Sequence, residues 1–214
     1  MKIETKNAFD TVKSFEEALA QYTGAPYAVT VDSCTNALFL CCTLEDVRGK
    51  TVTIPKRTYL SVPQSIMHAG AKVQFVDKDW KGIYNLEGTR VYDSAKRLTS
   101  GMYIPGSLMC LSFHTKKLLN IGKGGAILTD DPYAVEWLKR ARYEGRAEGL
   151  DYRDDDITEL GWNMYMTPEQ AARGWSLLQV LPKNNEDQGE NPPYKDLTEF
   201  TIFKPKTGGW GHRK

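Results

Sequence analysis

Short apolar runs alternate with amphipathic stretches along the first 181 residues of this chain. Runs rich in β-branched residues predict strands at residues 27–31, 51–54, 73–76, 90–92, 108–113 and 126–129. Apolar residues at helical spacing predict helices at residues 10–22, 37–44, 61–69, 131–144 and 167–181. Strands that alternate with helices through short connections are typical of an α/β domain with a mostly parallel sheet.

The composition narrows the class of protein and its surroundings. The chain has 214 residues, with 28 basic against 27 acidic side chains, so neither a nucleic acid nor a membrane surface is an expected partner. No run of about 18 apolar residues is present, and the first residues do not form a signal peptide. The four cysteines lack the spacing of a metal site. We expect reduced, mostly buried thiols in a cytoplasmic protein: Cys34, Cys41, Cys42 and Cys110.

The character of the sequence changes after residue 181. Residues 184–193 are polar and rich in turn formers, and residues 200–214 carry Phe200, Phe203 and Trp210 among glycines and prolines. We therefore expect a large domain over residues 1–182, followed by a linker and aromatic tail over 183–214. The tail is either without fixed structure or an arm packed on another surface, such as a partner subunit.

Two adjacent lysines lie between two predicted strands, in residues 110–126, C-L-S-F-H-T-K-K-L-L-N-I-G-K-G-G-A. An amine that is partly desolvated, or close to another cation, loses its proton and becomes a nucleophile that can form a Schiff base. The alternative is a solvated positive patch on a glycine-bearing loop. The loop alone does not choose between these readings.

Other polar residues also stand where predicted strands end. Ser33, Cys34 and Thr35 open a helix and could bind a phosphate, or Ser33 could simply cap that helix. Asp93 would be a buried carboxylate that needs a cationic partner. That partner could be a protonated ring nitrogen, or else one of two nearby cations, Lys96 and Arg97.

Aromatic residues add to this set. Tyr59 could stack on a flat ring or cover the core, and His114 could meet a cofactor or hold its loop by a hydrogen bond. Together these residues offer a phosphate site, an aromatic plate, a carboxylate for a ring nitrogen and a nucleophilic lysine. Such a set suits pyridoxal phosphate (PLP).

Several longer segments, from about Phe15 to about Leu181, resemble the DegT/StrS family of PLP-dependent sugar aminotransferases. V-D-S-C-T-N-A-L resembles the family's phosphate loop, and H-A-G-A-K-V-Q-F-V-D and D-S-A resemble its A-G-A-x-P-x-F-V-D and E-D-A-A segments. The family's Schiff-base segment, S-F-H-x-x-K-x-x-x-x-G-x-G-G-A, resembles S-F-H-T-K-K-L-L-N-I-G-K-G-G-A in this chain. A second family pattern, L-G-x-N-x-R-M-[ST]-x-x-Q-A-A, resembles L-G-W-N-M-Y-M-T-P-E-Q-A-A. The last two patterns are long and specific.

The resemblance implies a fold-type I PLP-transferase-like large domain. It implies a homodimer with shared active sites that passes an amino group from a glutamate-like amino acid to a keto sugar nucleotide. Lys117, rather than Lys116, would form the Schiff base, and Asp93 would pair with the pyridine nitrogen. The implied cofactor-binding residues are Ser33, Cys34, Thr35, Tyr59, Asp93, Ala95, Lys96, Ser112, His114, Lys117 and, toward the neighbouring subunit, Asn163.

The chain also departs from the family pattern. The segment between Asp79 and Asp93 is too short for the helix, strand and crossover that the family carries, so we expect a sheet that lacks a strand or is rewired. We also expect the family's C-terminal small domain to be largely absent. Lys96 stands where the family has Gln or His, and Tyr165 where it has Arg. Two other functions therefore stay open. One is a PLP enzyme acting on a different small amine or amino acid, and the other is a PLP-fold remnant with a binding or regulatory role.

Overall fold

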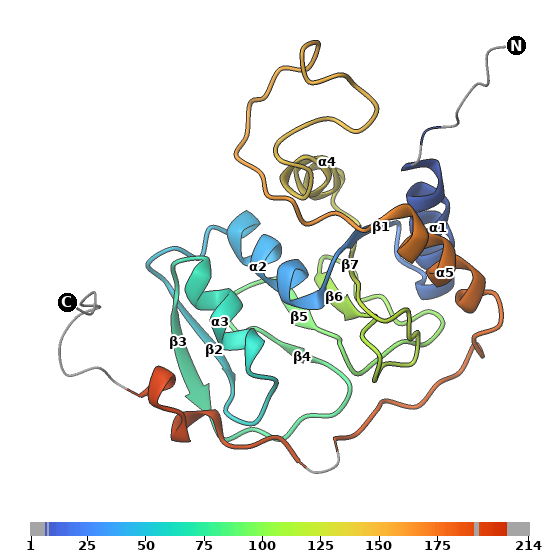
Figure 1. Cartoon of the computed structure of the whole chain (residues 1–214). Coiled ribbons are helices and arrows are strands. Elements are labelled where there is room, and N and C mark those ends of the chain that lie inside the picture. The colour runs from blue at the N-terminus through green and yellow to red at the C-terminus, as the bar shows by residue number, and fades with distance from the viewer. Residues whose placement is uncertain (1–6, 8, 191–192, 205–214) are drawn as a thin grey trace, which may run out of the picture.

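The structure, a computed structural model, describes residues 7, 9–190 and 193–204 (Figure 1). Helices and strands alternate through most of it, and two short 3-10 helices follow near the end. In chain order they are α1 (Phe9–Thr23), β1 (Tyr27–Val31), α2 (Cys34–Leu44), β2 (Thr51–Pro55), α3 (Ser61–His68), β3 (Lys72–Val76), β4 (Tyr84–Asn85), β5 (Val91–Asp93), β6 (Leu108–Ser112), β7 (Gly125–Thr129), α4 (Pro132–Ala141), α5 (Pro168–Leu178), η1 (Leu197–Glu199) and η2 (Thr201–Phe203).

The predicted α/β fold class is confirmed, with a sheet that is mixed. The main sheet has the strand order β1-β7-β6-β5-β4, and β2 and β3 form a second, two-stranded sheet. Two pairs, β5–β6 and β2–β3, are parallel, whereas β1–β7, β6–β7 and β4–β5 are antiparallel. Parallel pairing is thus less frequent than the sequence pattern suggested. Residues 113–124 join β6 to β7 without a crossover helix, so β7 returns in the opposite direction.

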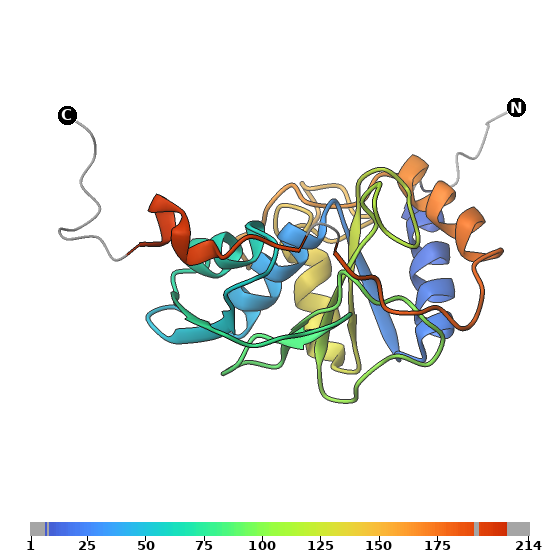
Figure 2. The same ribbon diagram turned by 90° about the horizontal axis from the view of Figure 1, so that it is seen from below.

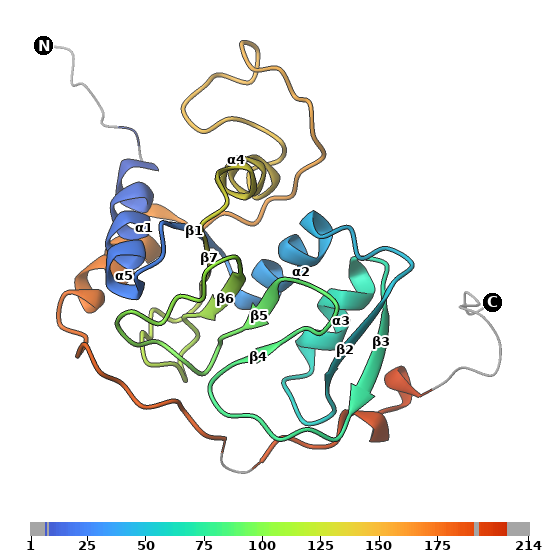
Figure 3. The same cartoon turned by 180° about the vertical axis from the view of Figure 1, so that it is seen from behind.

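Helices cover both faces of the main sheet, and the side chains of the central strands alternate between two apolar clusters. Met109 and Leu111 of β6 join the cluster under α1 and α5, whereas Leu108 and Cys110 face the cluster under α2, α3 and α4. A strand buried on both faces reads as a continuous apolar run, as β6 and β7 do. Figures 1 and 3 show α1 and α5 side by side at one end of the molecule.

The segment between Asp79 and Asp93, which we predicted to leave the sheet without a strand or rewired, is short in the structure as well. It contributes only β4, which lies antiparallel to β5 at the edge of the main sheet. An isolated bridge between Thr53 and Glu87, with N···O distances of 3.2 and 3.0 Å, links this segment to β2. The two sheets are therefore neighbours that share an apolar cluster instead of one continuous sheet.

Helix ends differ from prediction for local reasons. The helix predicted over 131–144 ends at Ala141, because Glu144 and Gly145 take left-handed conformations with φ of 62° and 81°. The helix predicted over 167–181 ends at Leu178. Its start is as expected: Thr167 and Gln170 form a capping box with Pro168 at the first helical position.

The C-terminal segment lies along the body of the same chain. It runs from α5 past β4 to β3, as Figures 1 and 2 show, and Phe203 meets Phe75 with ring centroids 5.7 Å apart. Residues 205–214, which include Trp210, lie outside the described residues. Among the helices of the described part of the chain, none combines the length and apolar character needed to cross a membrane.

Candidate active site

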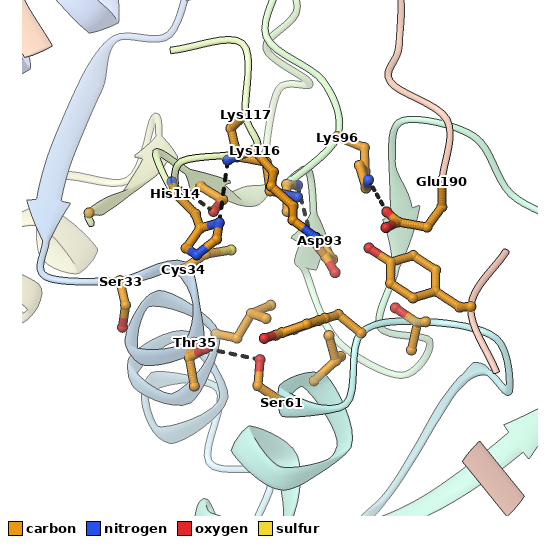
Figure 4. A pocket seen from close by; sticks show the side chains of 18 of the residues that line it. Ser33, Cys34, Thr35, Ser61, Asp93, Lys96, His114, Lys116, Lys117 and Glu190 are labelled. Atoms are coloured by element: carbon orange, nitrogen blue, oxygen red, sulfur yellow. Dashed lines mark hydrogen bonds and ion pairs between the residues drawn. The ribbon is translucent and has the colours of Figure 1, made fainter. Parts of the chain in front are cut away.

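A cavity of about 260 Å³ lies where β5 and β6 end against the starts of α2 and α3 (Figure 4). All the predicted site residues except Asn163 line it: Ser33, Cys34, Thr35, Tyr59, Asp93, Ala95, Lys96, Ser112, His114 and Lys117. Residues from four separate stretches of sequence, 33–35, 59, 93–96 and 112–117, thus meet in one place.

The parallel pair β5–β6 brings the two strand-end residues together. Asp93 is paired in register with Cys110, and Ser112 ends β6 two residues later. Because parallel strands end at the same edge of a sheet, their final side chains face the same space. This edge is where ligands bind in open α/β sheets.

The N-terminus of α2 forms one wall of the cavity. Ser33 is the N-cap, and its hydroxyl accepts a hydrogen bond from the backbone N–H of Asn36 at 3.2 Å. Thr35 donates its hydroxyl hydrogen to Ser61 at 2.9 Å. The capping role of Ser33 is therefore present, and it does not exclude anion binding, since the first-turn amides and the helix dipole still favour a negative charge here.

Asp93 is buried, and both its carboxylate oxygens accept hydrogen bonds from neutral donors. The N–H of Ala95 donates to Oδ1 at 2.9 Å, and the Tyr84 hydroxyl donates to Oδ2 at 2.9 Å. Burial raises the pKa of Asp93, while these hydrogen bonds and the charges of Lys117 and Lys96 oppose the rise. In the described part of the chain no ion pair reaches this carboxylate, so the group is suited to a cationic atom of a ligand.

The simpler reading of Asp93, in which Lys96 or Arg97 neutralises it, is not what the structure shows. Lys96 forms an ion pair with Glu190. Arg97 pairs with Asp187 at 2.7 Å. Both cations are held by the C-terminal segment instead.

The two adjacent lysines differ in their surroundings. Lys116 is exposed, whereas Lys117 is half-buried next to Asp93 and Lys96. Burial lowers the pKa of Lys117, and the positive charge of Lys96 lowers it further. A lowered pKa increases the fraction of unprotonated amine, which is the nucleophilic form.

Tyr59 and His114 lie at the mouth of the cavity. Tyr59 is 55% exposed, so it does not cover the core, and its ring meets that of Tyr194 with centroids 6.4 Å apart. His114 forms a bridge with Gly122, and its Nδ1 lies 3.4 Å from the N–H of Lys116. His114 thus helps to hold the loop while it also lines the cavity.

Asn163 lies away from the cavity of its own chain. It is exposed, follows α4 in a bridge with Tyr143, and donates from Nδ2 to Glu144 at 3.1 Å. Its predicted role toward a ligand of a neighbouring subunit stays a prediction.

Sequence reasoning missed several cavity residues. Trp80, Glu190 and Tyr194 line the cavity. Glu190 lies in the polar segment at 184–193, and Tyr194 directly follows it. Sequence reasoning also missed Tyr84, which does not line the cavity but lies in the shortened segment and links Asp93 to Thr58, whose Oγ1 is 2.6 Å from the Tyr84 hydroxyl oxygen. No local pattern marks these residues, because long-range packing alone brings them to the cavity.

The donor set of this cavity fits PLP. The start of α2 with its hydroxyls suits a phosphate, and the buried Asp93 carboxylate suits a protonated ring nitrogen. The half-buried amine of Lys117 lies on the remaining side. The volume of about 260 Å³ is close to the lower end of ligand sites, which start at about 300 Å³.

Known proteins with similar sequences belong to an aminotransferase family. The profile of the DegT/DnrJ/EryC1/StrS aminotransferase family matches residues 4–101 and 99–197. A UDP-4-amino-4,6-dideoxy-N-acetyl-beta-L-altrosamine transaminase of Campylobacter jejuni is 26% identical over 240 residues, which cover 92% of this chain and 64% of that protein. The GDP-perosamine synthase of Caulobacter vibrioides is 23% identical over 217 residues, covering 81% and 57%. This chain therefore spans less than two thirds of the length of these relatives.

Solved structures share the fold. The sugar aminotransferase CalS13 of Micromonospora echinospora superimposes with a TM-score of 0.68 at 20% sequence identity. The match covers 80% of this chain and 60% of that one.

Proposed function

Because this chain belongs to the DegT/DnrJ/EryC1/StrS aminotransferase family, we propose that it is a PLP-dependent aminotransferase. We propose further that it moves an amino group from a glutamate-like amino acid to a keto sugar nucleotide. The convergence of Asp93, Lys117 and the start of α2 on one cavity supports the reaction type. The names of the relatives, which act on UDP- and GDP-linked sugars, support the acceptor class.

The polar residues at the centre of the cavity have separate roles in this proposal. Ser33, Thr35 and the first-turn amides of α2 bind the phosphate, with Ser112 beside them. Asp93 holds a proton on the ring nitrogen. Lys117 holds the cofactor through its amine, and in its free form moves a proton at the Cα of the donor.

When bound, PLP supplies an electron-accepting ring that allows an amino group to be exchanged for a carbonyl oxygen. The protein must keep this chemistry away from water and hold the donor in place. Tyr59 is positioned to cover one face of a flat ring, and the C-terminal segment closes the side of the cavity next to Lys96.

Cofactor attachment can be tested by absorbance. Protein incubated with PLP and then desalted is expected to show a band at roughly 400–430 nm, and Lys117→Ala is expected to lose it. Lys116→Ala is the matched control, because it removes a neighbouring amine that is exposed. A wild-type protein that stays colourless would overturn the proposal.

The donor and acceptor can then be separated by half-reactions. Glutamate is expected to convert the band to a shorter-wavelength form, and a 4-keto sugar nucleotide to restore it. Return of the band with small keto acids but not with keto sugar nucleotides would show that the enzyme acts on a different small amine or amino acid.

We also propose that two copies of the chain share their active sites. The exposed position of Asn163, outside its own cavity, supports this arrangement. Lys117→Ala and Asn163→Ala proteins, each inactive alone, should regain about a quarter of wild-type turnover when mixed equally, since half of the dimers then contain one intact site. A monomer by sedimentation, or no recovery on mixing, would argue against shared sites.

A further inference from the structure

The side chain of Lys96 lies inside the cavity, and its partners come from far along the chain. Lys96 is only 7% exposed and forms an ion pair with the carboxylate of Glu190. Its ammonium also donates to the carbonyl oxygen of Gly189 at 3.1 Å. Figure 4 shows this pair on the side of the cavity opposite His114.

Backbone and side-chain contacts fix the segment that delivers Glu190, residues 185–190, which we call the strap. The N–H of Gln188 donates to the carbonyl of Lys96 at 2.9 Å. Arg97 donates two hydrogen bonds to Asp187, at 2.8 and 2.7 Å. The position of the Glu190 carboxylate is therefore set by the fold and does not depend on a flexible surface contact.

The pair is unequally buried. The side chain of Lys96 is 9% exposed and that of Glu190 is 28% exposed, so the carboxylate lies on the solvent side of the ammonium. A buried ammonium needs a counter-charge, and Glu190 supplies it. Another carboxylate arriving through the mouth of the cavity could supply the same charge without disturbing the core.

We propose that Lys96 is a specificity-determining residue that receives a carboxylate of the amino-acid donor, and that Glu190 occupies this position until the donor displaces it. The inference rests on the proposed aminotransferase function. An amino-acid donor carries a carboxylate next to the reacting amine, and Lys96 is close enough to Lys117 to influence its charge.

The other cations of the cavity are less suited to this role. Lys117 is assigned to the cofactor, and Lys116 is exposed on the loop. Lys123 forms an ion pair with Asp32 at 3.1 Å, outside the strap. A single ammonium bound by one carboxylate also favours an incoming monocarboxylate group over a diphosphate, which gains from several cations.

Binding of glutarate, a dicarboxylate that cannot react, tests the site directly. Titration calorimetry on the full chain, with and without PLP, is expected to show binding that is at least about tenfold tighter in Glu190→Gln than in wild type, because the internal competitor is gone. Lys96→Gln should lose binding. Glu186→Gln removes the same charge from an exposed position on the strap, and should behave as wild type.

Several outcomes would overturn the inference. Absence of glutarate binding in both wild type and Glu190→Gln, or equal binding in Lys96→Gln, would do so. If UDP or inorganic phosphate binds more tightly than glutarate and this binding needs Lys96, the residue binds the acceptor or a free anion and not the donor. If glutarate binding needs Lys96 but the protein never takes up PLP, the proposed carboxylate site is supported and the proposed aminotransferase function is refuted.

Steady-state kinetics provide a second readout. Glu190→Gln should lower the KM for glutamate several-fold while the KM for the acceptor stays unchanged. An equal change in both KM values would indicate a general distortion of the cavity, which contradicts a role confined to the donor.

Discussion

Burial and nearby positive charges have opposite effects on the pKa of Asp93. Its pKa is raised above the ordinary value of 3.8 by burial, so the folded chain holds a proton more tightly than the unfolded chain. The stability that this proton contributes is present below pH 3.8 and is lost as the pH rises through the folded-state pKa. Without bound PLP, wild-type protein should therefore lose stability relative to Asp93→Asn as the pH increases.

Urea unfolding at several pH values, from about 4 upward, measures this difference. Asp77 gives a control of opposite sign, since hydrogen bonds from Lys56 and Arg57 lower its pKa. The stability that ionised Asp77 contributes is present above its unfolded-state pKa and is lost as the pH falls. Asp77→Asn should therefore be least stable, relative to wild type, at the higher pH values. A flat difference for Asp93→Asn would contradict the role of burial.

Tyr84 positions the Asp93 carboxylate. Its hydroxyl lies 2.9 Å from Asp93 and 2.6 Å from Thr58. Tyr84→Phe leaves both buried partners with one hydrogen bond fewer, and we expect a loss of about 1–3 kcal/mol in the free energy of unfolding. Tyr92→Phe, on the next strand, is a control that should change stability by no more than about 0.5 kcal/mol. Equal effects in urea unfolding would show that the Tyr84 bonds add little.

Among the elements, α1, β1 and the loop after α4 are joined through Arg142. This side chain is fully buried and donates hydrogen bonds to Glu16 of α1, to the carbonyl of Thr30 in β1 and to Glu148. Glu16 is buried too, at 4% exposed. The contact is internal and far in sequence, since Arg142 and Glu16 are separated by 126 positions.

Removing Arg142 should therefore be costly. Arg142→Ala leaves the buried Glu16 without its guanidinium partner, and breaking such a pair typically costs about 3–5 kcal/mol. Arg153→Ala breaks an exposed pair with Asp151 and should have little effect on stability. Similar denaturation midpoints for the two variants would contradict the importance of this network.

The packing of α1 against α5 depends on a glycine. A Cβ at Gly174 would lie 2.6 Å from the ring of Phe15, which is fully buried. Gly174→Ala should therefore lower the free energy of unfolding by about 1–3 kcal/mol despite the better helix propensity of Ala. Ser176→Ala, at an exposed position of α5, should be neutral or slightly stabilising. A more stable Gly174→Ala protein would show that the two helices can separate at little cost.

For the whole molecule, the division into two sheets has a consequence for dynamics. All residues of β7 are buried and lie between two paired strands, whereas β3 is at most half-buried and pairs only with β2 among the described strands. Hydrogen exchange should be at least ~10-fold slower in β6 and β7 than in β3. Equal protection, measured by mass spectrometry on peptides, would mean that both sheets open together.

Local sequence patterns determined much of this architecture. Periodicity located the five α-helices and six of the seven strands within a few residues but missed β4, and the motifs around Ser33, Asp93 and Lys117 identified the family and the cofactor to be expected. Such features can be read from neighbouring residues, since helix periodicity, capping and strand-end motifs depend on short-range geometry.

Only the tertiary structure decided how distant residues meet. Tyr84 bonds Asp93 because the shortened segment adds an antiparallel edge strand, and Glu190 reaches Lys96 because the strap follows the body of the chain. The sheet became mixed and divided because strand pairing depends on connections and long-range packing. The sequence by itself thus determined most of the elements and the family motifs, whereas the side of the cavity around Lys96 depends on contacts between residues more than 90 positions apart.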